Sequence, residues 1–186
     1  MNILALYGSP RKEGNTDILL DEFLKGFASV HPNATIKRLY LRDYEIKPCT
    51  ECNACAKTGK CIIKDEMDGL YEEIINADAI VLSAPMFFYN LPAHTKALVD
   101  RCQAIWARKY LLKNLPGKPR KGFFISVGGT KGEHIFEGID LTVKTFYKSI
   151  NVDYTGKLLY SKIDNKGDIK NHPTALKEAF EAGKAF

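Results

Sequence analysis

Residues 3–30 have the sequence ILALYGSPRKEGNTDILLDEFLKGFASV, which contains the pattern of one strand, one loop and one helix. Hydrophobic residues 3–7 end at Gly8 and predict a short buried strand. From Thr16 onward, apolar side chains recur at helical spacing and predict a helix with one buried face. The loop between them is rich in polar groups, so this unit offers possible ligands at the end of its strand.

The same strand–helix unit recurs along the chain of 186 residues. Apolar runs predict five strands, which we expect at residues 3–7, 35–41, 79–83, 121–127 and 152–160. Amphipathic segments predict helices at residues 16–30, 65–77, 93–108, 135–150 and 173–185. The second strand alternates apolar and charged residues, so we expect it nearer the edge of the sheet.

Strands that alternate with helices at this spacing form a parallel sheet that is covered on both faces. Right-handed crossovers restrict how the strands connect, and they favour a five-stranded sheet of order 2-1-3-4-5. We therefore predict an α/β fold of three layers, an αβα sandwich. We expect a single domain over residues 1–186, with a cysteine-rich loop at residues 48–64.

Composition narrows the class of protein and its partners. The chain is 45% hydrophobic and 26% charged, and no apolar run reaches the length of a membrane span. The formal net charge of +5 comes from scattered lysines, so we expect neither nucleic-acid binding nor membrane attachment. The first residues do not have the pattern of a secretory signal, which predicts a cytoplasmic protein. Thiols stay reduced there unless they bind metal or do redox work.

Loops that follow the strands are the candidate ligand sites, because an open parallel sheet binds ligands at the carboxyl ends of its strands. The first loop, GSPRKEGNT at residues 8–16, supplies hydroxyls, an amide and an arginine directly before a helix. A helix start favours an anion, because its N–H groups are free and its dipole is positive there. The loop lacks the patterns G-x-x-x-x-G-K-[ST] and G-x-G-x-x-G. We therefore predict a site for one phosphate monoester; a capped strand-to-helix turn is the simpler alternative.

The second and third loops are suited to a flat ring. Residues 85–90, PMFFYN, bring apolar faces and backbone N–H groups to the end of the third strand. A flavin ring needs both, for stacking and for hydrogen bonds that tune its potential. Residues 128–130, GGT, follow the fourth strand and allow the backbone to approach the ring edge. An aromatic cluster alone is more often part of a core, but three such loops together predict a flavin site.

Two segments, GSPRKEGNT at residues 8–16 and SAPMFFYNLPAHTKALVDR at residues 83–101, closely resemble the flavodoxin-like NAD(P)H-dependent FMN reductases. The resemblance covers essentially the whole chain and implies a flavodoxin-like fold, FMN as cofactor, NADH or NADPH as donor, and a homodimer or homotetramer. It implies that the FMN phosphate binds at Ser9, Arg11, Asn15 and Thr16. It implies that the ring lies against Pro85, Met86, Phe87, Phe88, Tyr89 and Asn90, with Gly128, Gly129 and Thr130 nearby.

Four cysteines, Cys49, Cys52, Cys55 and Cys61, lie in one segment, PCTECNACAKTGKC at residues 48–61. The first three recur at every third residue, so one tight loop can direct their thiolates at a single cluster. The pattern is close to the C-x2-C-x2-C run of bacterial ferredoxins and favours a [4Fe–4S] cluster. Zinc sites usually pair two distant C-x2-C units and fit less well. Thiols without metal, including a reversible disulfide, are the third interpretation.

The longer segment CTECNACAKTGKCIIKDEM at residues 49–67 resembles the iron–sulfur flavoprotein branch of the same family. It connects the second strand to the helix before the third. We therefore expect the cysteines beside the ligand-bearing edge of the sheet, where they could exchange electrons with a flavin in the same or a neighbouring subunit.

Three functions are consistent with these features. The first is an FMN-dependent NAD(P)H oxidoreductase that passes electrons by a ping-pong route to a small-molecule or protein acceptor, with no acid–base catalytic side chain assigned. The alternative is an iron–sulfur flavoprotein that carries electrons from ferredoxin and has little NAD(P)H activity. The net charge of +5 is compatible with docking an acidic ferredoxin. A cofactor-free interaction domain is the third.

Overall fold

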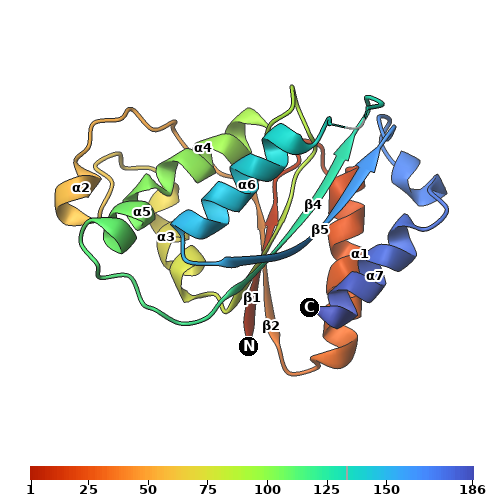
Figure 1. Cartoon of the computed structure of the whole chain (residues 1–186), viewed down its shortest axis with the longest axis horizontal. Coiled ribbons are helices and arrows are strands. Elements are labelled where there is room, and N and C mark those ends of the chain that lie inside the picture. Colours follow the sequence, from red (N-terminus) through yellow and green to blue (C-terminus); the bar gives the residue numbers. More distant parts are fainter. Residues whose placement is uncertain (133) are drawn as a thin grey trace.

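The computed structural model describes residues 1–132 and 134–186 of the chain, and Figure 1 shows how their elements are arranged. Five parallel strands form one sheet in the order β2-β1-β3-β4-β5. The strands are β1 (Asn2–Tyr7), β2 (Thr35–Tyr40), β3 (Ala79–Ser83), β4 (Lys121–Gly128) and β5 (Asp153–Ser161). The predicted strand order is confirmed, and each predicted strand matches its observed bounds to within one residue.

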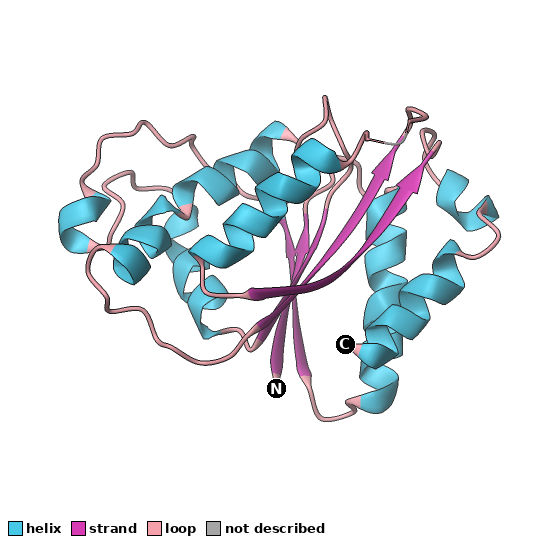
Figure 2. Ribbon diagram, in the orientation of Figure 1, coloured by secondary structure: helices cyan, strands magenta, loops and turns pink. Residues whose placement is uncertain are grey.

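Helices cover both faces of the sheet, which confirms the predicted three-layer αβα sandwich (Figure 2). One face carries α1 (Asn15–Val30) and α7 (Ala175–Ala185), and the other carries α3 (Met67–Asn76), α4 (Ala93–Arg101), α5 (Gln103–Tyr110) and α6 (Glu137–Ser149). The short turns η1 (Leu41–Asp43), α2 (Cys55–Thr58) and η2 (Asp168–Asn171) lie in connections. Among the described helices, none combines the length and apolar character needed to cross a membrane.

One predicted helix, over residues 93–108, is divided in the structure into α4 and α5 at Cys102. The backbone N–H of Cys102 donates to the carbonyls of both Leu98 and Val99, at 3.1 Å each. This shared bond tightens one turn and interrupts the regular helix without turning the chain away from the sheet.

The side chains of β1 enter two separate cores. Leu4 and Leu6 pack with the helices from α3 to α6, whereas their neighbours along the strand pack with α1 and α7. A central parallel strand must be apolar on both faces for this reason. In β2, only Leu39 is fully buried, which confirms the expected edge position.

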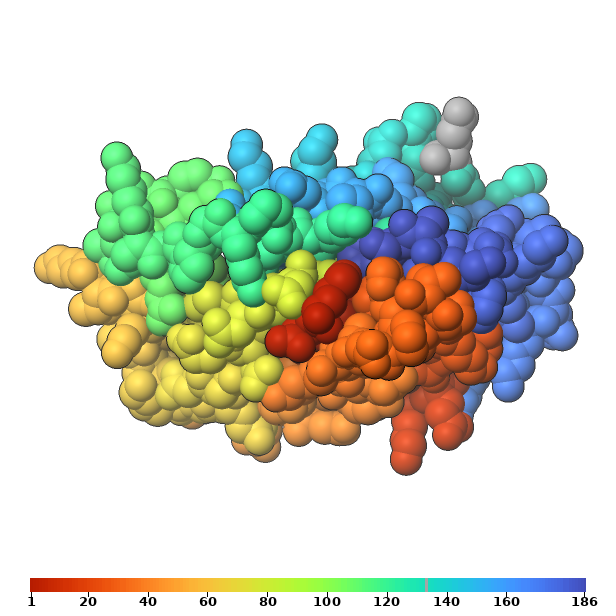
Figure 3. Space-filling view, turned by 90° about the horizontal axis from the view of Figure 1, so that it is seen from below, coloured from red at the N-terminus to blue at the C-terminus, as the bar shows by residue number. Residues whose placement is uncertain are grey.

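Helices α1 and α7 approach each other closely through two glycines. A Cβ on Gly26 would overlap the backbone of Phe180, and a Cβ on Gly183 would overlap the backbone of Phe23. The missing side chains therefore let the two helices touch along their backbones. Figure 3 shows α1 in orange beside the blue C-terminal end of the chain. This contact holds the start of α1 beside the connection that joins β5 to α7.

Candidate functional site

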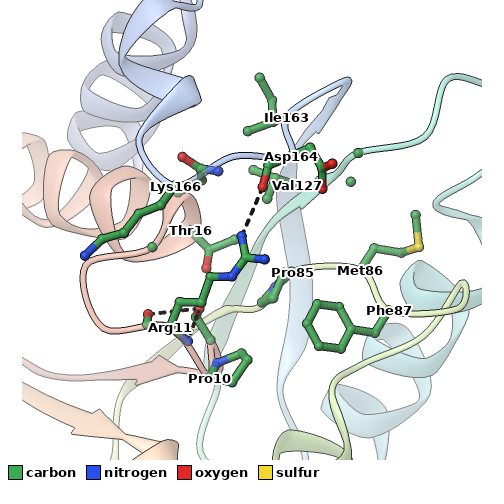
Figure 4. A pocket seen from close by; sticks show the side chains of 15 residues that line it. Pro10, Arg11, Thr16, Pro85, Met86, Phe87, Val127, Ile163, Asp164 and Lys166 are labelled. Atoms are coloured by element: carbon green, nitrogen blue, oxygen red, sulfur yellow. Dashed lines mark hydrogen bonds between the residues drawn. The ribbon is translucent and has the colours of Figure 1, made fainter.

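A recess lies at the carboxyl ends of β1, β3, β4 and β5, where the loops that follow these strands meet the start of α1 (Figure 4). The structure brings these predicted residues together in its wall: Ser9, Arg11, Asn15, Thr16, Pro85, Met86, Phe87, Gly128 and Gly129. They come from three loops that are far apart in the sequence. The recess is therefore assembled by the sheet, because neighbouring parallel strands end at the same edge.

The start of α1 presents unpaired polar groups to this recess. Gly14 precedes the helix without a side-chain cap, and the first-turn N–H groups of residues 15–17 have no acceptor among the described residues. The hydroxyl of Thr16 is buried, and it too lacks a hydrogen-bond partner among the described residues. Buried polar atoms are normally paired. This group of free donors beside a positive helix end therefore suits a bound anion such as phosphate.

The loop between β1 and α1 is held in shape by Ser9. Its hydroxyl accepts a hydrogen bond from the N–H of Arg11 and donates one to the carbonyl of the same residue, both at 3.1 Å. The chain then turns through Glu13, whose φ of 55° is left-handed. A Cβ on Gly14 would lie only 2.9 Å from the Ser9 hydroxyl oxygen, so a larger residue there would displace this group.

The guanidinium of Arg11 reaches across the recess to the opposite loop. Its Nη1 donates to the carbonyl of Asp164 at 3.0 Å (Figure 4). The side chain is exposed and forms this one neutral contact among the described residues. It can therefore turn toward an anion without breaking an ion pair.

Asn15 lines the recess, and its side chain is bonded to the opposite connection. Its side-chain nitrogen donates to the carbonyl of Asn165 at 2.8 Å. Its side-chain oxygen accepts from the N–H groups of Gly167 and Ile169, at 2.9 and 3.3 Å. Through these three bonds, Asn15 anchors the β5–α7 connection to the start of α1.

That connection supplies lining residues that the sequence reasoning missed, namely Ile163, Asp164 and Lys166. The signal was present, because the polar run SKIDNKGD at residues 161–168 follows a predicted strand. The rule that ligands bind near the reversal of strand order points only to the loops after the first, third and fourth strands. The contact between α1 and α7 brings this fourth loop to the same edge.

The loop after β3 is fixed to the sheet at its base and strained at its tip. The N–H of Met86 donates to the carbonyl of Val127 in β4 at 2.8 Å. Phe87 and Asn90 exchange two backbone hydrogen bonds around a two-residue turn, at 2.8 and 2.9 Å. The turn residues Phe88 and Tyr89 have φ values of 48° and 64°, which normally favour glycine or asparagine. Such strain at an exposed tip is typical of a functional segment.

A second, wider depression adjoins the recess and is lined by Met86, Phe87, Phe88, Tyr89, Gly129, Thr130 and Asp164. The recess has a volume of about 70 Å³ and the depression about 670 Å³. Of these two cavities, the depression therefore offers more room for a flat aromatic ring. Phe88 is fully exposed beside it and Tyr89 is 56% exposed. Asn90 is not among the described residues that line either cavity. Its side-chain oxygen accepts a hydrogen bond from the N–H of Leu91 at 2.8 Å.

A buried ion pair supports the loop between β1 and α1 from behind. Arg42 donates to the carboxylate of Asp17 at 3.0 Å and to the carbonyl of Ser9 at 3.2 Å. Asp17 is 3% exposed. Burial raises the pKa of this carboxyl to about 6, although Arg42 acts in the opposite direction. Neither residue was identified from the sequence, because they are distant along the chain and belong to no motif.

The cysteine segment lies at the far end of the molecule from the recess. Figures 1 and 3 place α2 at one end of the long axis and the β5–α7 connection toward the other. The helix α2 packs on α5, and Arg108 donates to the carbonyl of Gly59 at 2.9 Å. The expectation that the cysteines lie beside the ligand-bearing edge is therefore wrong. The connection between β2 and α3 is long enough to place the cysteines away from the carboxyl edge of the sheet, where β2 ends.

The four thiols of this segment are close enough to influence one another. Burial raises the pKa of Cys55, and the neighbouring Cys61, Cys49 and Cys52 raise it further. No group of three or more His, Cys, Asp or Glu side chains in the described residues is arranged to hold a single metal ion. A single zinc ion would need its sulfur ligands about 2.3 Å away. A multi-iron cluster accepts sulfurs that are farther apart, so the donor set suits a cluster in its chemistry but is not a preformed site.

Comparison with known proteins identifies the family and the relatives to which this chain is similar. The sequence profile of the family "NADPH-dependent FMN reductase" matches residues 1–136. An iron-sulfur flavoprotein of Methanosarcina thermophila is 33% identical over 131 residues, which are 70% of this chain and 65% of that protein. One of Archaeoglobus fulgidus is 39% identical over 114 residues, 61% of this chain and 55% of that protein. The chain thus spans about half to two thirds of these curated relatives.

A similar solved structure is the NAD(P)H:quinone oxidoreductase from Methanothermobacter marburgensis. It superposes with a TM-score of 0.74 over 99% of this chain and 94% of that chain, at 18% identity. At this identity the likeness concerns the fold alone, and it confirms the flavodoxin-like architecture. The predicted resemblance to iron–sulfur flavoproteins is also confirmed at the level of sequence.

Proposed function

Because this chain belongs to the NADPH-dependent FMN reductase family, we propose that it is an FMN-dependent NAD(P)H oxidoreductase. The observation that carries this proposal is the convergence of the strand-end loops on the buried hydroxyl of Thr16 at the start of α1, which has no hydrogen-bond partner within residues 1–132 and 134–186. When bound, FMN supplies the redox chemistry: it takes a hydride from NADH or NADPH and passes electrons to an acceptor in a second half-reaction.

In this proposal the recess holds the phosphate of FMN. The N–H groups of the first turn of α1 and the hydroxyl of Thr16 donate hydrogen bonds to it. The hydroxyl of Ser9 does so once it turns away from the carbonyl of Arg11. The guanidinium of Arg11 leaves the Asp164 carbonyl and pairs with the phosphate. Asn15 acts by holding the β5–α7 connection, and Lys166 adds a cation at the rim.

The wider depression holds the flavin ring. We assign the apolar side chains of residues 85–89 to its faces and the backbone of residues 128–130 to its edge. A Cβ on Gly128 would come within 2.8 Å of the end of the Met86 side chain, so glycine keeps this edge open. Asn90 keeps the two-residue turn in place and is not assigned a contact with the ring. These side chains bind and orient the cofactor, and none is needed as an acid or a base.

The four thiols at positions 49, 52, 55 and 61 are the proposed ligands of a [4Fe–4S] cluster, which would pass electrons one at a time. Reduced thiols are the normal condition of the cytoplasm, where we place the protein. Since the cysteine segment and the recess lie at opposite ends of the molecule, the cluster would exchange electrons with the flavin of another subunit. A homodimer or homotetramer is therefore part of the proposal.

A second candidate function is an electron carrier that docks ferredoxin. The observation that favours it is the charge around the cysteine segment, where Lys47, Lys57, Lys60 and Lys64 are all exposed. An acidic protein partner would be attracted to this surface. In that case electrons would enter at the cysteine segment, and activity toward NADH and NADPH would be low.

Anaerobic purification followed by stopped-flow reduction separates these candidates. The oxidoreductase should bind about one FMN per chain, and its flavin absorbance should bleach rapidly with NADH or NADPH. The carrier should show rapid bleaching only with reduced ferredoxin. Protein that stays colourless after reconstitution with FMN would rule out both. Iron and acid-labile sulfide, measured on the same sample, test the cluster separately from the flavin.

A further inference from the structure

Arg101, the last residue of α4, is completely buried by its surroundings although it carries a full charge. Its side chain is 0% exposed and that of its partner Asp65 is 5% exposed. Nη1 donates to Asp65 Oδ2 at 2.6 Å and Nη2 donates to Asp65 Oδ1 at 3.1 Å. Two parallel bonds of this kind define a bidentate pair, the strongest form of side-chain ion pair.

The same guanidinium holds the backbone on both sides of the cysteine segment. Nη1 donates to the carbonyl of Lys47 at 2.9 Å, and Nη2 donates to the carbonyl of Ile63 at 3.2 Å. Lys47 lies two residues before Cys49, and Ile63 lies two residues after Cys61. One buried side chain therefore joins the two ends of the segment.

The carboxylate of Asp65 completes this arrangement from the other side. It accepts from the N–H of Lys47 at 2.9 Å and from the N–H of Met67 at 3.1 Å. Burial alone raises the pKa of Asp65, but the hydrogen bonds from Arg101 and from these N–H groups lower it below its usual value. Asp65 is therefore ionised at neutral pH, and the pair keeps its charges.

Between these two ends, few of the described hydrogen bonds attach the segment to the rest of the protein. Cys49 and Cys52 are exposed and α2 is a single turn. Apart from the Arg108 bond to Gly59, the described side-chain hydrogen bonds of residues 49–61 stay within the segment. Closing a flexible loop of this length has an entropic penalty that grows with its length. A contact that joins both ends removes much of that penalty before any ligand binds.

We propose that Arg101 is the positioning residue of the cysteine segment: with Asp65 it holds the two ends of the segment together, so that the four thiols act as one site. This inference rests on the proposed function in one respect, namely that the ligand of the four thiols is a [4Fe–4S] cluster. A guanidinium is required, because a lysine ammonium cannot form the bidentate pair and reach both carbonyls from a fixed plane.

Arg120 provides a matched control. It is also buried, at 3% exposure, and it donates to the carbonyls of Ala77, Ile74 and Ile150. It joins the ends of α3 and α6 at the amino-terminal end of β4. Among the described side-chain hydrogen bonds, it has none to the cysteine segment. A lysine at either position removes a buried guanidinium, but only one of the two acts on the cysteines.

The test compares the full chain with Arg101→Lys and Arg120→Lys after anaerobic reconstitution with iron and sulfide. We expect Arg101→Lys to lower iron and acid-labile sulfide per chain at least about fivefold, while FMN per chain is unchanged. Arg120→Lys should lower the melting temperature and leave iron per folded chain unchanged. Normal iron content in Arg101→Lys, or an equal loss of iron in Arg120→Lys, would overturn the proposal.

A second measurement does not depend on the cluster. In the metal-free protein, diamide oxidises pairs of thiols, and mass mapping reports which cysteines become linked. Because the closed segment keeps its ends together, the disulfide that joins Cys49 to Cys61 should form at least about fivefold faster in the unchanged chain than in Arg101→Lys. Equal rates would overturn the positioning role. If the unchanged chain binds no iron yet shows this rate difference, the cluster proposal fails and the positioning role stands.

A double variant covers the case in which Arg101→Lys does not fold. Arg101→Met with Asp65→Leu replaces the buried ion pair by apolar side chains, which proteins often tolerate. It removes the donors to Lys47 and Ile63 without leaving an unpaired charge. The same low iron content and slow disulfide formation are expected, and normal values would overturn the proposal.

Discussion

The recess and the cysteine segment are built in opposite ways. The loops around the recess leave the strands of one sheet, and Asn15, Ser9 and Arg42 fix their backbones through several hydrogen bonds. The cysteine segment is held at its base by Arg101 and in its middle by Arg108. The recess is therefore fixed by contacts along each of its loops, whereas the cysteine segment is fixed mainly where Arg101 joins its two ends and where Arg108 holds Gly59.

The geometry of the two sites is therefore stabilised by different parts of the structure. A site at the carboxyl edge of a parallel sheet takes its geometry from strand register, which the hydrophobic core stabilises. A site on a long connection has no such support and needs a buried anchor of its own. Variants that affect one region should therefore leave the other unchanged. The first prediction below tests this independence directly, and the others test how the recess is built.

The largest expected effect comes from replacing Cys49, Cys52, Cys55 and Cys61 together by serine. Bound iron and acid-labile sulfide should fall to background, because serine does not replace thiolate in a cluster of this kind. FMN content and the rate of flavin reduction by NADH or NADPH should be unchanged. Loss of FMN from this variant would show that the two regions are coupled.

The pH dependence of stability should reveal the buried Asp17 behind the recess. Its folded-state pKa of about 6 lies above the ordinary aspartate value of 3.8, so the folded chain binds this proton more tightly than the unfolded chain does. Between about pH 4 and pH 6 the free energy of unfolding should therefore fall as pH rises, by about 1–3 kcal/mol.

Urea unfolding at several pH values measures this change. Asp17→Asn should flatten the curve in that window, because the side chain no longer titrates. The exposed Asp68, at the start of α3, provides the control, and Asp68→Asn should leave the slope as it was. A slope that survives in Asp17→Asn would assign the titration to another group.

Thr16→Val should separate stability from cofactor binding within the recess. The valine keeps the shape of threonine but lacks the hydroxyl, so FMN should bind about tenfold more weakly, a loss of about 1–2 kcal/mol. The FMN-free protein should be equally or slightly more stable, because the change removes a buried hydroxyl that has no partner in the part of the chain that the structure describes. Fluorescence titration and thermal melting measure the two effects, and unaltered affinity would remove Thr16 from the phosphate site.

The smallest effect concerns the strained turn at the rim of the depression. Phe88→Asn with Tyr89→Gly places residues that favour positive φ at both turn positions. The FMN-free protein should gain about 1 kcal/mol in unfolding free energy. FMN affinity should fall, because the aromatic faces are lost. An increase in stability without any loss of FMN affinity would assign these aromatics to another partner.

Much of the fold could be predicted from the chain alone. The continuous apolar run at residues 79–83 predicts a central parallel strand, and the alternation in residues 35–41 predicts a strand nearer the edge. The loops after the first, third and fourth strands were also correctly brought together, because the strand order requires it. The division of the helix at Cys102 was missed, since a shared backbone hydrogen bond leaves no mark in side-chain periodicity.

The sequence by itself determined the sheet order, the loop that meets the start of α1 and the grouping of four cysteines, because these depend on periodicity and local spacing. Only the tertiary structure decided that the β5–α7 connection closes the recess, that Asn15 is an anchor, and that Arg101 joins the ends of the cysteine segment. These depend on contacts between residues that are far apart in the chain, such as Gly26 with Phe180. Such contacts follow from packing, which no local pattern encodes.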